Sequence, residues 1–131
     1  MITLNDAYRI IDAATEKAEE LGVPSNVAVV DGGGNLLSFA RMDGAWLGSI
    51  SIAIDKAFTA RAFDMSTADL GEASQPDGAL FGINTSNGGR IVIFAGGVPL
   101  SKEDEVVGGI GASGGTPEQD AEIAQAGAGA F

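Results

Sequence analysis

The stretch VAVVDGGGNLLSFAR at residues 27–41 decides the fold of this protein. Its first four residues are an apolar run typical of a buried strand. Asp31–Asn35 predicts a turn, because Gly and Asn adopt left-handed backbone conformations at little cost. Leu36–Arg41 then returns as a second strand. The stretch therefore predicts a β-hairpin, and with it an antiparallel sheet.

A helix is predicted before this hairpin. Apolar side chains recur at helical spacing along one face from Leu4 to Leu21. Thr3 and Asp6 have the spacing of a capping box, and Gly22 supplies a C-terminal stop.

Two helices are predicted after the hairpin. The second helix of the chain is expected from about Ala45 to Phe63, where several inner residues are alanine and allow close approach to the sheet. Ser66 or Thr67 is expected to cap a short third helix that ends near Gly71.

Further strands are expected between residues 79 and 112. Arg90–Phe94 predicts a strand, and Val98–Leu100 is expected to pair with Glu105–Ala112 in a second hairpin. Ala79–Ile83 fits either a strand or a short helix.

A last helix is predicted from Thr116 as N-cap to Ala124, whereas residues 126–131 contain too much glycine to predict a helix. Together these elements predict a single α+β domain over residues 1–131. Helices are expected to pack on an antiparallel sheet of about five strands.

The composition excludes several kinds of chemistry. The chain has no cysteine and no histidine, which removes disulfides, thiolate metal sites, the commonest general base and the commonest metal ligand. Acid–base chemistry would have to use Asp, Glu, Lys, Tyr or Arg. No spacing of carboxylates predicts a metal site.

The net charge of the chain limits the kinds of partner that it can bind. Eighteen acidic residues oppose seven basic ones, giving a formal charge of −11. Such a surface repels phosphate backbones and anionic lipids, so we expect no nucleic-acid or membrane partner. The first residues lack the pattern of a signal peptide, which predicts a cytoplasmic location.

The order and spacing of several motifs resemble the GlcG/HbpS family, also called the haem-degrading or DUF336 family. The resemblance covers nearly the whole chain. The residues that carry it are 28–31, 34–36, 41–45, Ser49, 56–60, Phe63, Thr67, 96–100, 106–111, 113–115 and Asp120.

The resemblance implies a profilin-like fold and homo-oligomers built from dimers, often octamers. It also implies varied roles: haem-binding or haem-degrading redox sensors, and accessory proteins in glycolate and diol utilisation. Haem-binding members can place histidine near the iron, and this chain has none. Axial ligation would fall to Tyr8, a methionine or a hydroxyl, so the sequence disfavours haem.

Arg41, Asp43 and Lys56 form the first candidate site. The first hairpin ends at Arg41, and the chain then turns into the helix that carries Lys56, so both cations are expected to converge on a small anionic ligand. Asp43 and Lys56 are the candidate catalytic residues, with Asp43 moving a proton. Alternatively, Asp43 caps the helix and pairs with Arg41. A buried Lys56 needs a partner, for which Asp31, Asp43 and a ligand carboxylate are candidates.

Two glycine-rich segments complete the candidate ligand site. Gly96 and Gly97 predict a bulge in a pocket wall, and the segment formed by Ser113, Gly114 and Gly115 exposes backbone N–H groups to an anion. Close backbone packing is the alternative explanation for both segments. Trp46 is expected at a subunit interface.

Three functions stay open from the sequence. The first is a small-molecule-binding homo-oligomer, with haem as a disfavoured ligand. The second is an isomerase or lyase that moves a proton on a small anionic oxygenated metabolite. The third is an accessory or scaffold protein. Whether the protein is an enzyme is left open by the sequence.

Overall fold

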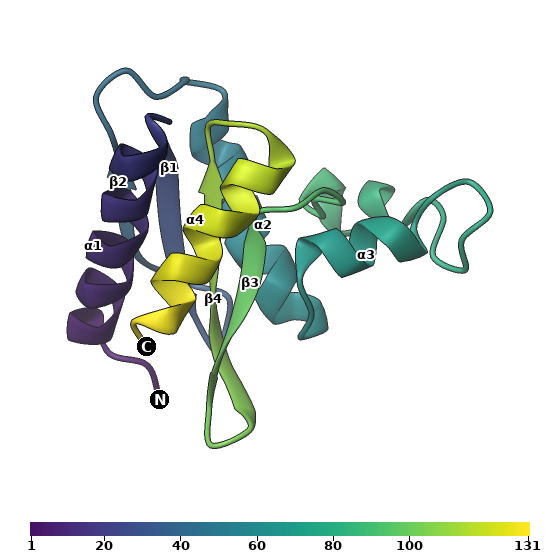
Figure 1. Ribbon diagram of the computed structural model, residues 1–131. Coiled ribbons are helices and arrows are strands. Elements are labelled where there is room, and N and C mark those ends of the chain that lie inside the picture. Colours follow the sequence, from purple (N-terminus) through teal and green to yellow (C-terminus); the bar gives the residue numbers. More distant parts are fainter.

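The computed structural model describes all residues 1–131 and places a four-stranded sheet between helices (Figure 1). The elements in chain order are α1 (Leu4–Leu21), β1 (Asn26–Asp31), β2 (Leu36–Arg41), α2 (Ser49–Phe63), α3 (Thr67–Ala73), η1 (Ile83–Thr85), η2 (Asn87–Gly89), β3 (Gly97–Lys102), β4 (Glu105–Ser113) and α4 (Pro117–Gly129).

The sheet has the order β2-β1-β4-β3, and every pair of neighbouring strands is antiparallel. Both predicted hairpins are present, β1–β2 and β3–β4. The β1–β4 pairing joins them across a long stretch of chain. The α+β class is therefore confirmed, with four strands in place of about five.

Helices cover both faces of the sheet. On one face, α1 and α4 lie side by side and bury an apolar cluster that includes Ile10, Val27, Val29, Ile110 and Ile123. On the other face, α2 packs on Ala28 and Val30. Alternation along β1 thus sends successive side chains to opposite layers.

The α2 layer lies very close to β4. A Cβ added at Gly109 would collide with the carbonyl oxygen of Ala57, and one at Gly111 with that of Ala53. Alanines on α2 and glycines on β4 thus bring backbone against backbone, as the alanine-rich helix predicted.

The predicted strand Arg90–Phe94 is not a strand. This segment passes over α2, and the N–H of Val92 donates to Oγ1 of Thr59 at 3.1 Å. It lies outside the sheet because β3, which begins at Gly97, occupies the place next to β4. Ala79–Ile83 is mainly turn, ending at the first residue of η1.

Two helix boundaries differ from prediction. Helix α2 begins at Ser49, with Gly48 as N-cap, so Asp43 does not cap it. Helix α4 continues to Gly129 through the glycine-rich tail. Gly127 packs against Ile110 and against the backbone of α1 at Ile10. This tertiary contact outweighs the low helix propensity of glycine.

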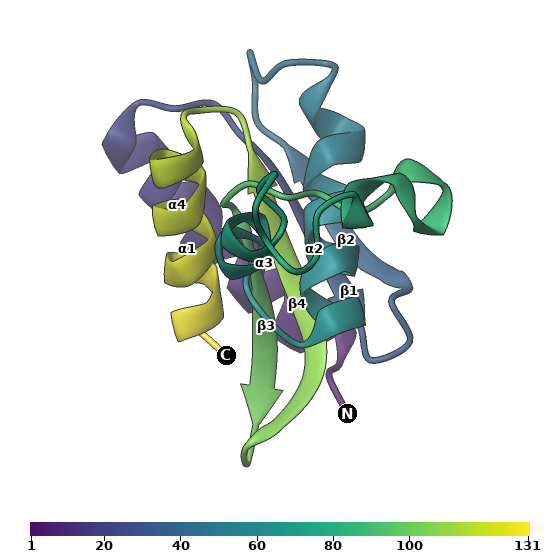
Figure 2. The same ribbon diagram turned by 90° about the vertical axis from the view of Figure 1, so that its right-hand side faces the viewer.

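Helix α3 and the loop after it project from the body of the molecule in Figure 1 and face the viewer in Figure 2. Phe81 on this projection has 66% of its surface exposed. No helix has the length and apolar character needed to cross a membrane.

Candidate functional site

Lys56 is fully buried between α2, β4 and α4. Its Nζ donates to Oδ2 of Asp120 at 2.9 Å and to the carbonyl oxygen of Ala112 at 2.9 Å. Burial lowers the pKa of this ammonium from its ordinary 10.5, and the charge and hydrogen bond of Asp120 raise it in part. The partner of Lys56 is therefore Asp120, and neither Asp31 nor Asp43, two of the three candidates, pairs with it.

Gly96 and Gly97 lie against Lys56. Gly96 has φ +126°, and a Cβ there would lie 2.5 Å from Nζ of Lys56. A Cβ at Gly97 would lie 2.5 Å from the carbonyl oxygen of Lys56. The ring of Phe94 approaches the ammonium at 5.0 Å from its centroid. These glycines make room for a buried ion pair, and none of them lines a pocket.

The second glycine-rich segment, Ser113–Gly115, also contacts other parts of the chain in place of a ligand. The N–H of Gly115 donates to Oδ1 of Asp120 at 2.9 Å. A Cβ at Gly114 would collide with the carbonyl oxygen of Pro24, and Ser113 is 5% exposed. One carboxylate, Asp120, thus joins Lys56 to this segment.

Arg41 and Asp43 lie apart from this network. Both are exposed, and neither forms any of the ion pairs of the protein. Arg41 is paired with Asn26 at the end of the sheet. The structure therefore does not bring Arg41 and Lys56 to one ligand. Asp31 accepts from the N–H groups of Gly33 and Asn35 in its own turn.

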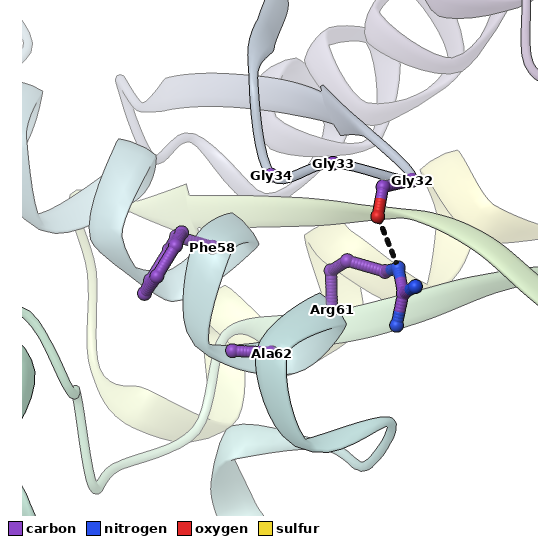
Figure 3. A pocket seen from close by; sticks show the side chains of 6 residues that line it. All are labelled: Gly32, Gly33, Gly34, Phe58, Arg61 and Ala62. Carbon is purple, nitrogen blue, oxygen red and sulfur yellow. Dashed lines mark hydrogen bonds between the residues drawn. The ribbon is translucent and has the colours of Figure 1, made fainter.

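A pocket of about 220 Å³ lies between the turn of the first hairpin and α2 (Figure 3). It is lined by Gly32, Gly33, Gly34, Phe58, Arg61 and Ala62. Nε of Arg61 donates to the carbonyl oxygen of Gly32 at 2.8 Å, which ties the helix to the turn. Nη1 of the same side chain donates to Asp64 at 2.6 Å.

A second pocket of about 300 Å³ adjoins the first and shares Gly32 and Arg61 with it. Its remaining lining residues are Met1, Ile2, Glu105, Val106 and Val107. A third pocket, of about 240 Å³, lies elsewhere, between the end of α1 and Met42.

Two residues of these sites were not predicted as such. Asp120 is among the residues that carry the family resemblance but not among the candidate site residues, and Arg61 lies unremarked in the predicted second helix. The position of Asp120, in the first turn of a helix that begins just after Gly114 and Gly115, was the signal in the sequence that could have indicated its role. Nothing in the spacing around Arg61 indicates a pocket.

Comparisons with known sequences place the whole chain in one family. A family model described as "Haem degrading protein HbpS-like" matches residues 2–129. An uncharacterized 15.0 kDa protein in the dhaT-dhaS intergenic region of Citrobacter freundii is 43% identical over 124 residues, covering 95% of this chain and 87% of that protein. Corrinoid adenosyltransferase PduO of Salmonella typhimurium is 39% identical over 95% of this chain, which spans only 37% of PduO.

Solved structures agree with these matches. The Klebsiella pneumoniae protein ORFY, of family DUF336, superposes with a TM-score of 0.96 at 40% identity, over 99% of this chain and 90% of that one. PduOC in complex with heme superposes with a TM-score of 0.95 at 38% identity, over 99% and 94%. An HbpS double mutant from Streptomyces reticuli gives 0.87 at 34%, over 98% and 85%. The matching model, these identities and the shared fold together show that the chain belongs to the HbpS-like family.

Proposed function

We propose that this protein is a small-molecule-binding homo-oligomer and that its ligand lies beside Arg61. One observation carries the proposal: the Arg61 side chain, 29% exposed, separates two adjoining pockets. Its two hydrogen bonds, to Gly32 and Asp64, use two of the five N–H donors of a guanidinium. The remaining donors are available to an acceptor in either pocket.

The linings suggest the kind of ligand. A guanidinium fork matches a carboxylate or a phosphate. Phe58 on one side, and Val106 with Val107 on the other, offer apolar walls. Glu105 disfavours a second negative charge in the larger pocket. The proposed ligand therefore combines one anionic group with a small apolar part.

The heme complex of PduOC supports small-molecule binding by this fold, since that protein is 38% identical to the chain. The residues of a single chain here do not fit haem. Histidine and cysteine are lacking, and the sulfur of Met42 already accepts a hydrogen bond from the N–H of Ser25 at 3.4 Å. Each pocket is also at or below the small end of the usual range for ligand sites.

The proton-transfer alternative has no comparable support. Lys56 lines none of the pockets, and its ammonium is engaged by Asp120 and Ala112. Asp43, the other candidate catalytic residue, is exposed in a turn. The two side chains therefore share no space in which a substrate could meet both.

The homo-oligomer part of the proposal rests on exposed apolar side chains. Trp46 is 66% exposed, Leu47 is 80% exposed, and Phe81 is 66% exposed. Large exposed apolar side chains commonly mark protein–protein contacts. A dimer-based assembly, such as the octamer that the family resemblance implies, would cover them.

The ligand site is tested by soaking crystals with acetate, butyrate and inorganic phosphate, and by calorimetric titration with the same probes. We expect density beside the Arg61 guanidinium, and we expect Arg61→Gln to weaken binding by about tenfold or more. Lys17→Gln is the matched control, since it also removes one positive charge but lies on α1, on the opposite face of the sheet.

The proposal is wrong if none of the probes binds, or if Arg61→Gln binds them as the wild-type protein does. Haem is titrated in parallel and followed by Soret absorbance. A tight stoichiometric haem complex would show that the assembly supplies an iron ligand and a cavity that one chain lacks.

A further inference from the structure

Asn26, the first residue of β1, has an incomplete set of hydrogen bonds. Its side chain is fully buried, and Nδ2 donates to the carbonyl oxygen of Trp46 at 3.0 Å. A carbonyl only accepts, so this bond fixes the orientation of the amide. Its Oδ1 is the one buried side-chain nitrogen or oxygen without a partner in the protein. Such an atom calls for a donor that the chain does not supply.

The register of the sheet shows what surrounds this oxygen. Ala28 and Val30 of β1 face α2, so Asn26 faces the same layer by alternation. Asn26 is paired directly with Arg41 on β2 and with Ser113 on β4. Directly paired residues point to the same side of a sheet. Arg41, Asn26 and Ser113 therefore form one row beneath the start of α2.

The start of α2 completes the surroundings. Ser49, its first residue, is 5% exposed and lies one turn before Ala53, which packs on the sheet. Gly48 is the N-cap and gives the helix no side-chain cap. The N–H groups of Ser49 and Ile50 donate to the carbonyl oxygens of Trp46 and Leu47 at 3.1 and 3.2 Å, and this end of the helix carries the positive end of its dipole.

We propose that Asn26, Ser49 and Ser113, with Arg41 at the edge, bind a small anion that carries a neighbouring hydroxyl group. We call these four residues the Asn26 cluster. The ligand hydroxyl donates to Oδ1 of Asn26, because an anionic oxygen would only repel that acceptor. The anionic group lies between the Arg41 guanidinium and the positive, N-terminal end of the α2 dipole. The serine hydroxyls donate or accept as the ligand requires.

The loop over the cluster controls access to it. Within a single chain, Trp46 and Leu47 leave most of their apolar surface uncovered, so few contacts of the chain itself hold this part of the loop down. The bond from Asn26 to the Trp46 carbonyl is a direct tie between loop and cluster. Gly44, at φ +83°, is where the chain turns into the loop. Ligand entry requires this loop to lift, and the site is separate from the pockets at Arg61.

The class of ligand is tested with three probes of equal carbon number: lactate, propionate and propane-1,2-diol. Each is titrated into the intact protein by calorimetry. Lactate has both groups, propionate lacks the hydroxyl, and the diol lacks the charge. We expect lactate to bind at least about tenfold more tightly than either of the others. Equal affinities for lactate and propionate, or no lactate binding at millimolar concentration, overturn the proposal.

Variants locate the site. Arg41→Gln and Asn26→Leu should each weaken lactate binding by about tenfold, and Lys17→Gln should not change it. Arg41 is exposed, so its variant decides the outcome even if Asn26→Leu fails to fold. Loss of lactate binding in Arg61→Gln with full binding in Arg41→Gln would place lactate in the Arg61 pockets. That outcome overturns this proposal and leaves the proposed function standing.

Discussion

At the scale of single residues, the buried pair of Lys56 and Asp120 destabilises the fold if either member is removed, because the other charge is then buried without a partner. The two side chains are 0% and 4% exposed. Taking each charge out of water costs several kcal/mol, and their mutual attraction with extra hydrogen bonds must offset it. Ala112 and Gly115 provide those bonds. The network therefore behaves as one structural unit that joins α2, β4 and the start of α4.

Lys56→Ala should lower the free energy of unfolding by about 3–5 kcal/mol, because it leaves the Asp120 carboxylate buried without a cation. Thermal and urea denaturation measure the effect. The double variant Lys56→Met with Asp120→Leu should recover much of the loss, since apolar replacement of both members removes the unpaired charge. A Lys56→Ala protein as stable as the wild type would contradict this account of the pair.

Asp6 makes the free energy of unfolding depend on pH in the acid range. Its pKa is lowered from 3.8 to about 2 by the backbone N–H of Thr3, then by the side chains of Arg9 and Thr3. A lowered folded-state pKa contributes stability that is present above pH 3.8 and is lost as the pH falls toward 2. The stability difference between the wild type and Asp6→Asn should therefore shrink across this window in acid titrations followed by circular dichroism.

Asp12→Asn is the control for that titration, because it removes an exposed carboxylate from the same helix. If the Asp6→Asn difference persisted unchanged at pH 2, the capping box of Thr3 and Asp6 would not be the source of the effect.

At the scale of elements, the close contact between α2 and β4 depends on glycine residues, which have no side chain. The glycines of β4 let the helix backbone touch the strand, and this contact carries Lys56 to Asp120. Helix α2 has apolar residues around much of its circumference and no side-chain cap. Its position is thus set by packing and not by local signals.

Gly111→Ala should destabilise the protein by about 1–3 kcal/mol, because the new methyl would meet the carbonyl of Ala53 and lie 2.6 Å from the backbone nitrogen of Ala57. Neither backbone atom can move without shifting α2. Gly129→Ala is the matched control, since nothing lies within 4 Å of its added Cβ. Equal melting temperatures for the two variants would show that α2 is less tightly seated than its contacts indicate.

At the scale of the whole molecule, exposed apolar side chains occur both on the loop before α2 and on the projection after α3. The two surfaces lie in different parts of the chain, which suits an assembly with more than one kind of contact.

The protein should form an assembly well above its monomer mass of 13.1 kDa in light scattering at micromolar concentration. Phe81→Ser should reduce the mass of the assembly, because it removes the most exposed aromatic side chain of the projection. Tyr8→Ser, which changes an exposed aromatic on α1, is the comparison variant. A wild-type protein that is monomeric at this concentration would exclude the homo-oligomer.

The sequence by itself determined the elements whose signals are local. Thr3 and Thr116 cap α1 and α4 as predicted, because a capping box spans only four residues. The two hairpins follow from short turns between apolar runs. The HbpS-like family was also identifiable, because its motifs are spread in order along the whole chain.

Only the tertiary structure decided which side chains meet. Lys56 and Asp120 are 64 positions apart, and the β1–β4 pairing that aligns Asn26 with Ser113 closes an even longer loop. Such contacts depend on how layers stack, which no local spacing encodes. The same reason moved Arg90–Phe94 out of the sheet and extended α4 over Gly127. Within the candidate site, the chemistry of lysine predicted that a buried Lys56 needs a partner. The identity of that partner, the pockets at Arg61 and the unpaired oxygen of Asn26 depend on packing across the sheet.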